Sequence, residues 1–314
     1  MTGHDPDQRP RNAMTIDVED YFQVAAFDGH IRREHWDQLP CRVEANVDRI
    51  LALFDEHGVK GTFFVLGWMA ERYPQMLRRI VAGGHEVASH GYDHVRIVHQ
   101  TPKVFREEVH RTGALLEDAT GHAVCGYRAA TFSIVEETLW ALDQLLEAGY
   151  RYSSSIYPVH HDLYGMPDAP RFPFRHLGDG GLLEVPLTTV KIGKRNYPCG
   201  GGGYFRLFPY ALSRWAIRRV NEHEGQSAVF YFHPWEIDPD QPRQSGIGLK
   251  TRVRHYLNLS RMEGRLIRLL RDFDWGRMDA VFLEGRSEGS LSAPLVGRDP
   301  GMHDVFLKRR SDAP

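Results

Sequence analysis

The chain has 314 residues, of which 42% are apolar and 25% are charged, a composition typical of a globular protein and unlike that of a disordered chain. The formal net charge of -2 at pH 7 gives no electrostatic reason to expect nucleic acid or an anionic membrane as a partner. The polar N-terminal stretch lacks the apolar core of a secretory signal, and no apolar run approaches the length of a membrane-spanning helix. We therefore expect a protein without a transmembrane segment, located in the cytoplasm or at the inner face of the membrane.

Short runs of β type alternate with segments of helical period between a flexible N-terminal arm, residues 1–12, and a loop-like tail, residues 287–314. The runs are AMTIDV (13–18), GTFFVL (61–66), HEVAS (85–89), CGYRA (125–129), YRYSSSI (150–156), LLEVPLTTV (182–190) and SAVFYFH (227–233). Apolar residues recur at helical spacing within 43–54, 69–80, 139–146, 212–220 and 257–270. This alternation predicts an α/β protein with a parallel sheet, and seven strands favour closure into a barrel over an open sheet.

The first chemical feature is the segment TIDVED, which places Asp17, Glu19 and Asp20 at the end of an apolar strand. Active sites of barrels and parallel sheets are built at this end of the strands. Strand alternation puts Asp17 and Glu19 on the same side, whereas Asp20 lies just past the strand and is free to turn inward. The plainer alternative is a solvated loop whose carboxylates cap the next element.

The second feature is the segment SHGYDH, in which His90 and His94 directly follow a predicted strand. Histidines at positions i and i+4 share one face of a helical turn, so their imidazole nitrogens can converge on one ion. Two imidazoles and one carboxylate form a common open zinc site. We therefore predict a metal held by His90, His94 and a carboxylate from TIDVED, with Glu19 and Asp20 as the competing third ligands.

Two further polar residues stand at predicted strand ends. Arg128 in GYRAATFSI is expected either to form a salt bridge at the barrel mouth or to position a catalytic carboxylate. His233 in AVFYFHPWEID ends an almost wholly apolar strand, and a histidine at a strand mouth opposite a metal is well placed for acid catalysis. The alternative is a loop histidine that bonds only to backbone.

Taken in order, TIDVED, SHGYDH, GYRAATFSI, LLEVPLTTV and YFHPWEI resemble the motifs of the polysaccharide deacetylase family, also called the NodB homology group or carbohydrate esterase family 4. The chain is most similar to the exopolysaccharide-locus deacetylases associated with exosortase systems. The resemblance covers roughly residues 13–240 as a catalytic barrel, and residues 241–286 correspond to a C-terminal extension packed on it.

The resemblance implies a distorted (β/α)7 barrel with one divalent metal, usually Zn²⁺. By position, Asp17 matches the family's catalytic base, His90 and His94 match its metal histidines, Arg128 matches the residue that orients the base, and His233 matches the catalytic acid. The chain departs from the usual pattern because Val18 follows Asp17 where many members have a second aspartate. It also has Ala130 in place of proline, and Ser153–Ser155 where many members have an aspartate.

The predicted function is removal of acetyl groups from a polysaccharide, or from its lipid-linked precursor, in exopolysaccharide biosynthesis. Tyr92, Phe132 and Trp235 are candidate walls for sugar rings, although core packing is an equal alternative for aromatic residues, and the resemblance suggests that Leu183 borders an acetyl pocket. The partner is then an acetylated glycan, with no nucleic acid and no assigned oligomeric state. The alternatives are a hydrolase of a small cyclic amide or ureide, and a carbohydrate-binding relative without catalysis.

Overall fold

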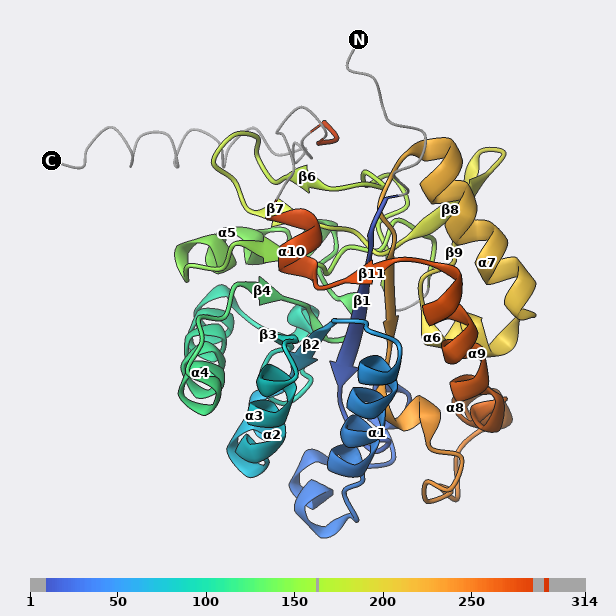
Figure 1. Ribbon diagram of the computed structural model, residues 1–314. Coiled ribbons are helices and arrows are strands. Elements are labelled where there is room, and N and C mark those ends of the chain that lie inside the picture. Colours follow the sequence, from blue (N-terminus) through green and yellow to red (C-terminus); the bar gives the residue numbers. More distant parts are fainter. Residues whose placement is uncertain (1–9, 162–163, 285–290, 294–314) are drawn as a thin grey trace, which may run out of the picture.

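A curled sheet of parallel strands forms the centre of the molecule (Figure 1). In the computed structural model, which describes residues 10–161, 164–284 and 291–293, seven parallel strands follow the order β10-β1-β2-β3-β4-β5-β7. These strands are β1 (Asn12–Val18), β2 (Thr62–Val65), β3 (Glu86–Ser89), β4 (Gly126–Tyr127), β5 (Tyr152–Ser153), β7 (Leu183–Glu184) and β10 (Val229–Phe232). The antiparallel β6 (Phe174–Arg175) extends one edge, β11 (Trp275–Gly276) pairs with β1, and β8 (Thr189–Ile192) with β9 (Arg195–Pro198) forms a separate hairpin.

Helices cover the outside of the sheet (Figure 1). They are α1 (Val43–Glu56), α2 (Gly67–Arg72), α3 (Pro74–Ala82), α4 (Pro102–Thr120), α5 (Trp140–Glu147), α6 (Gly202–Leu207), α7 (Tyr210–Arg218), α8 (Leu249–Tyr256), α9 (Leu259–Asp272) and α10 (Met278–Phe282). None of the described helices is long and apolar enough to cross a membrane.

The central strands are buried on both faces, and their alternate residues belong to different cores. Ile16, Phe63 and Phe232 point outward into the large cluster that the helices cover. Phe64 and Tyr231, each one residue away along its strand, belong to a second cluster inside the curl of the sheet. Parallel strands with both faces covered produce near-continuous apolar runs, which is why these segments could be recognised in the sequence.

The sheet is curled without complete closure. Within the described residues, β10 and the β7–β6 edge are the two ends of the strand path. The free side of β10 is instead met by the loop before α6, where the backbone N–H of Tyr231 donates to the carbonyl oxygen of Gly200 at 2.7 Å. A side chain at Gly200 would collide with the backbone of Val229, so this close approach requires glycine there. The result is a distorted, incompletely closed barrel.

The C-terminal part of the chain blocks the end of the barrel where the strands begin. Trp275 and Gly276 pair with the start of β1. The backbone N–H of Met278 donates to Oγ1 of Thr62, and that of Asp279 donates to the buried Glu86 carboxylate. Because α10 covers this end, the polar side chains that follow the strands lie at the opposite, C-terminal end, which we call the mouth of the barrel.

The predicted α/β barrel-type fold is confirmed, and each of the seven predicted runs contains one of the parallel strands. The last part of LLEVPLTTV was predicted wrongly as one strand, because Pro186 separates β7 from the β8–β9 hairpin. Helix α4 was not predicted, although Thr101 accepts a hydrogen bond from the N–H of Val104 at its start and Gly121 ends it with φ 73°. The predicted arm lies outside the described residues up to residue 9, as does the predicted tail except for residues 291–293.

Candidate active site

The candidate residues lie at the C-terminal ends of four strands. Asp17 and Glu19 flank Val18, the last residue of β1, while His90 follows β3, Arg128 follows β4 and His233 follows β10. Parallel strands end at one edge of the sheet, so strand pairing alone brings these side chains to one mouth. The structure therefore joins residues that are more than 200 positions apart in the sequence.

A buried ion pair joins Asp17 to Arg128. Nη1 of Arg128 donates to Oδ1 of Asp17 at 2.6 Å, and the two side chains are 0% and 2% exposed. Such a pair in a dry site is held in place because neither charge can be solvated separately. The second oxygen of Asp17, Oδ2, lies 4.0 Å from Nε2 of His233.

Arg128 is itself fixed from several sides. Its Nη1 also donates to Oγ1 of Thr15 at 2.8 Å, and its Nε and Nη2 donate to the carbonyl and hydroxyl oxygens of Ser154, each at 3.1 Å. The guanidinium lies 4.0 Å from the centre of the Phe64 ring. Ser154 thus supplies oxygen acceptors to Arg128 within the segment where many relatives carry an aspartate. The departure at Ser153–Ser155 was visible in the sequence, but neither Ser154 nor Thr15 was predicted as a partner of Arg128.

Glu19 lies between two histidines. Its Oε2 is 3.3 Å from Nε2 of His94, and its Oε1 is 3.0 Å from Nε2 of His233. Burial alone would raise the pKa of Glu19, but the charges of His94 and His233 outweigh it and lower that pKa to about 2. Asp17 and Glu19 therefore approach the same histidine, as the strand alternation predicted.

His90 and His94 approach each other, with ring centres 5.4 Å apart, but the predicted helical turn between them is wrong. The segment after β3 is a loop in which Gly91 and His94 have φ values of 74° and 60°. These left-handed residues bend the chain so that both rings turn toward the mouth. Nδ1 of His90 lies 2.9 Å from the carbonyl oxygen of Arg128, a bond that fixes the ring and leaves Nε2 as its ligand nitrogen.

Asp20, the competing third ligand, is directed elsewhere. Its Oδ1 accepts from the backbone N–H of Tyr21, and its Oδ2 accepts from the backbone N–H groups of Arg42 and Val43 at the start of α1. A carboxylate at a helix start satisfies N–H groups that have no partner within the helix. Asp20 therefore does what the plainer interpretation of TIDVED expected, and Glu19 occupies the mouth.

His233 is supported by a residue that the sequence analysis did not single out. Nδ1 of His233 lies 2.7 Å from Oε1 of Glu236, whose other oxygen accepts from the buried Arg206 at 2.6 Å. Burial lowers the pKa of His233, but Glu19 and Glu236 outweigh it and raise that pKa to about 10. Glu236 was readable as the third residue of the turn Pro234–Ile237, where a carboxylate reaches back to the preceding residue, whereas Arg206 gives no local signal.

The predicted substrate-binding residues are spread over different surroundings. Trp235 stacks on His233 with ring centres 5.3 Å apart. Phe132 and Leu183 are buried in the inner core of the barrel. Tyr92 lies away from these contacts, because its hydroxyl donates to Glu71 at 2.6 Å and its ring packs under Arg111.

The donor set at the mouth suits a divalent cation. No three His, Cys, Asp or Glu side chains within the described residues form a preassembled metal cage. However, Oε2 of Glu19 is buried and, apart from its 3.3 Å ion-pair contact with His94, makes no hydrogen bond among the described residues. Nδ1 of His94 is likewise buried without a hydrogen-bond partner there. A bound cation would offset the cost of burying the Glu19 carboxylate oxygen in this way. One carboxylate and two imidazoles, with one ring fixed by a backbone carbonyl, are the chemistry that Zn²⁺ prefers.

The fold and the mouth together define a (β/α)-barrel protein with a histidine and carboxylate centre of the kind found in metal-dependent hydrolases. Residues 35–153 match the family model described as polysaccharide deacetylase, so the chain contains a domain of that family. Residues 154–283 match a second model, described as a domain of unknown function (DUF3473). The first match contains His90, His94 and Arg128, the second contains His233, and Asp17 and Glu19 precede both.

Curated relatives agree with this assignment. The chain is 32% identical over 121 residues to a peptidoglycan deacetylase of Helicobacter pylori, covering 38% of this chain and 39% of the relative. It is 33% identical over 97 residues to a peptidoglycan-N-acetylglucosamine deacetylase of Bacillus cereus, covering 31% and 35%. It is 31% identical over 96 residues to a chitooligosaccharide deacetylase of Bradyrhizobium, covering 31% and 42%. The matched part thus spans between 35% and 42% of the length of these three relatives.

One solved structure resembles the chain over nearly its whole length. It is a Mycobacterium smegmatis protein, provisionally described as a polysaccharide deacetylase, with a TM-score of 0.62 and 19% identity, covering 95% of this chain and 97% of that one. At this identity the likeness shows the fold, and it agrees with the curled barrel described above.

Proposed function

We propose that this protein hydrolyses N-acetyl groups of an amino-sugar glycan with the help of a divalent cation. The observation that carries the proposal is that an arginine-held carboxylate, Asp17, lies 4.0 Å from His233, which also contacts Glu19 at the barrel mouth. His233 is itself held by the Glu236 carboxylate. An acid and a base within reach of one reacting group are what amide hydrolysis requires. The match to deacetylases, in the domain that contains His90 and His94, supports the same chemistry.

Asp17 acts as the general base. Arg128 holds Oδ1, so Oδ2 is the oxygen that faces His233 and the space between them. Oδ2 takes a proton from water as the water oxygen forms a bond with the acetyl carbonyl carbon. Arg128 makes four hydrogen bonds, one of them to Asp17, and so keeps this carboxylate in one orientation. A fixed orientation lowers the entropic cost of reaching the reactive geometry.

His233 acts as the general acid. Its pKa is raised, and Glu236, which bonds to Nδ1 and is not a proposed cation ligand, favours the protonated ring. Nε2 donates its proton to the amide nitrogen as the bond between carbon and nitrogen breaks, which gives acetate and a free amine. Nδ1 stays bonded to Glu236 throughout, so the ring keeps its orientation while it changes charge.

Glu19, His90 and His94 are the residues that we propose to hold the cation, with Zn²⁺ as the expected ion. A cation held there would supply Lewis-acid polarisation of water and of the acetyl carbonyl. Asp20 is left out of this set because both of its oxygens accept backbone hydrogen bonds.

The proposed substrate class is an acetylated polysaccharide or its lipid-linked precursor in exopolysaccharide biosynthesis. The support for a glycan comes from the relatives, which are peptidoglycan and chitooligosaccharide deacetylases. The support for an exopolysaccharide is the motif resemblance alone. Trp235 is 6% exposed and stacks on both His233 and His255, so it supports the proposed acid and does not present an open ring face to a sugar.

Acetate release from chitotetraose and from peptidoglycan fragments tests the proposal. The wild type loaded with zinc is compared with Asp17→Asn, with His90→Ala and with the control Asp48→Asn, which removes a surface carboxylate paired with Arg79. We expect release by the wild type and the control, and a loss of at least about 100-fold in the two site variants. Circular dichroism confirms that the variants remain folded.

Two outcomes would overturn the proposal. Release that survives both site substitutions would remove Asp17 and His90 from the chemistry. A zinc-loaded wild type that releases no acetate from either glycan, but opens a cyclic ureide, would favour the small-substrate alternative on the same fold.

A further inference from the structure

The exposed apolar side chains of this protein are concentrated on one part of the chain. Among the described residues, eleven large apolar side chains are exposed, and eight of them lie between residues 192 and 253. They are Ile192, Tyr197, Leu207, Phe208, Leu212, Trp215, Leu249 and Val253, with exposures between 43% and 77%. Isolated exposed apolar residues are ordinary, but eight in one region of a monomer mark a contact surface.

The same region is strongly basic. Residues 185–221 and 241–262 contain twelve of the 39 Lys and Arg residues and no Asp or Glu, and the five acidic residues of this region all lie between them, in 222–240. One of the twelve, Arg206, is buried against Glu236. The near-neutral net charge, from which an anionic membrane partner was not expected, therefore hides a strong local asymmetry. Such a patch attracts anions whatever the net charge of the whole chain.

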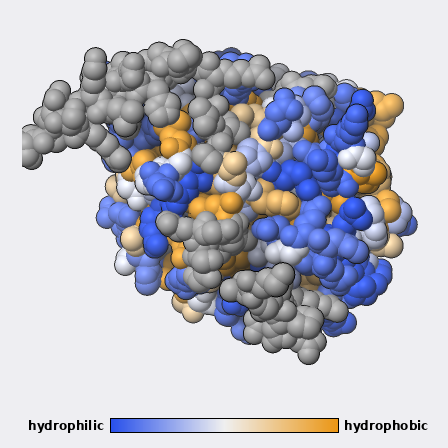
Figure 2. Space-filling model, turned by 90° about the horizontal axis from the view of Figure 1, so that it is seen from above, coloured by the Kyte–Doolittle hydropathy of each residue, from blue (hydrophilic) through white to orange (hydrophobic). Residues whose placement is uncertain are grey.

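These segments are neighbours in the fold. Helix α7 packs beside β8 and α9. Arg206 of α6 donates to the carbonyl oxygens of Arg254, His255 and Leu257, which ties α6 to the end of α8. In Figure 1 the β8–β9 hairpin, α7, α8 and α9 all lie on the right of the molecule, opposite α4. Figure 2, viewed from above, shows hydrophobic and hydrophilic residues interspersed along that right edge. We call the surface formed by β8–β9, α6, α7 and α8 the basic-apolar face.

Each helix of the basic-apolar face carries both kinds of side chain. In α7, Leu212 and Trp215 are three positions apart and share the exposed side. In α8, Leu249 and Val253 are four apart and alternate with exposed basic residues. Apolar side chains in the middle of a basic surface are the pattern of segments that lie in the lipid headgroup region.

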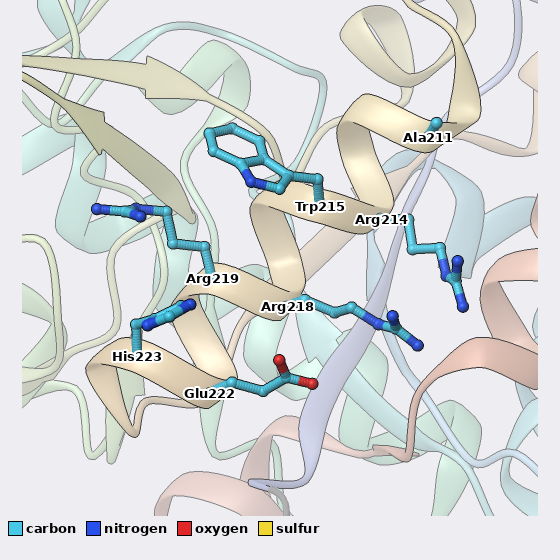
Figure 3. A pocket seen from close by; sticks show the side chains of 7 residues that line it. All are labelled: Ala211, Arg214, Trp215, Arg218, Arg219, Glu222 and His223. Atoms are coloured by element: carbon cyan, nitrogen blue, oxygen red, sulfur yellow. The ribbon is translucent and has the colours of Figure 1, made fainter.

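A shallow cavity on α7 adds a place for an anion. It has a volume of about 240 Å³ and is lined by Ala211, Arg214, Trp215, Arg218, Arg219, Glu222 and His223 (Figure 3). Arg214 and Arg218 extend to one side of the helix, and Arg219, Trp215 and His223 lie toward the other. Nε of Arg218 and of Arg219 has no hydrogen-bond partner among the described residues. The guanidinium groups can bind a lipid phosphate, and the indole beside them can contact the start of the acyl chains.

From these observations we infer that the basic-apolar face docks on an anionic lipid bilayer. Charge complementarity selects this occupant. Two copies of the face would repel each other, because β8–β9, α6, α7 and α8 contain no acidic residue and Glu222 is the one carboxylate that lines the cavity. A water-soluble polyanion would match the charge but would leave side chains such as Leu249, 77% exposed, without an apolar partner. A bilayer satisfies both features.

The face adjoins the proposed active site. His255 of α8 stacks on Trp235 with ring centres 4.2 Å apart, and Trp235 stacks on His233. The opposite side of the same short helix carries Leu249 and Val253. Docking would therefore hold the barrel mouth close to the lipid surface. The inference itself does not depend on catalysis, and its test measures binding only.

The test is cosedimentation of the full chain with vesicles. One set of vesicles is phosphatidylcholine alone, and in the other about a third of the lipid is phosphatidylglycerol. We expect binding to the anionic vesicles that weakens as salt is raised, and at least about tenfold weaker binding to phosphatidylcholine.

Matched variants locate the binding. Lys250→Gln/Arg252→Gln should weaken partitioning about 25-fold, since each basic residue near an anionic surface contributes about fivefold. Leu212→Ser/Trp215→Ser should weaken it by at least about tenfold. The controls Lys103→Gln/Arg106→Gln and Val98→Ser/Val104→Ser remove similar side chains on or beside α4, across the molecule, and should bind as the wild type does.

Three results would overturn the inference. The first is that the protein does not sediment with anionic vesicles at low salt. The second is that the control variants lose binding as much as the variants of the basic-apolar face. The third is that the wild type self-associates while the Leu212→Ser/Trp215→Ser variant is monomeric, which would make the face a contact between copies of the chain. Light scattering after gel filtration reports the third.

Discussion

Replacing Arg128 with methionine should destabilise the fold more than any surface substitution. The change keeps much of the side-chain volume but leaves the Asp17 carboxylate, 2% exposed, without its counterion. It also removes donors from Thr15 and Ser154. Breaking a buried pair by removing one partner costs about 3–5 kcal/mol, so the melting temperature of this 314-residue chain should fall by about 5–8 °C.

A double-mutant cycle measures this pair directly. Urea unfolding of Arg128→Met, Asp17→Asn and the double variant should give a coupling free energy above about 1.5 kcal/mol, because the double variant no longer buries an unpaired charge. Arg171→Met is the control, since it breaks the half-buried pair with Glu224 away from the mouth. Acetate release should be lost in all three site variants and kept in the control. A cost below about 1 kcal/mol for Arg128→Met, or additive single effects, would refute the argument.

Three other buried carboxylates, Glu19, Asp20 and Glu86, have different roles that single amide substitutions can distinguish. Glu19→Gln should weaken zinc binding more than about 100-fold, measured by competition with a chelating dye, because even outer-shell changes cost up to that much. Asp20→Asn should leave zinc binding intact and lower the free energy of unfolding by about 1–2 kcal/mol, since it weakens the bonds at the start of α1. Burial, aided by Asp279, raises the pKa of Glu86 from 4.5 to about 7. Its contribution to stability is therefore full below about pH 4.5 and is lost as the pH rises through about 7. Glutamine does not ionise, so Glu86→Gln should not lose this contribution. The free energy of unfolding in urea of Glu86→Gln, relative to that of the wild type, should therefore increase from about pH 5 to about pH 8. A relative free energy that does not change with pH would contradict the raised pKa of Glu86.

The strands and the mouth of the barrel were predictable because they depend on local patterns. Strands buried on both faces read as apolar runs, and polar residues such as His90, Arg128 and His233 at the ends of those runs stood out. Helix α4 was missed although its start and end carry capping residues, because its buried side is narrow and is interrupted by the polar Thr112. The left-handed turn between the two histidines was hidden, because i, i+4 spacing fits a helix and a loop equally well.

The sequence by itself determined the order of the elements, the family of the deacetylase domain and the strand ends that meet at the mouth, because period and motif are written along the chain. Only the tertiary structure decided which of the neighbouring carboxylates, Glu19 or Asp20, lies at the barrel mouth. It directed Asp20 to the start of α1 and Glu19 to His94 and His233, because α1 returns to that point with unpaired backbone N–H groups. It likewise gathered the acid-free segments into one basic face. Charges far apart in sequence act together only once the fold has brought them within a few ångströms, where Coulomb energies and hydrogen bonds become large.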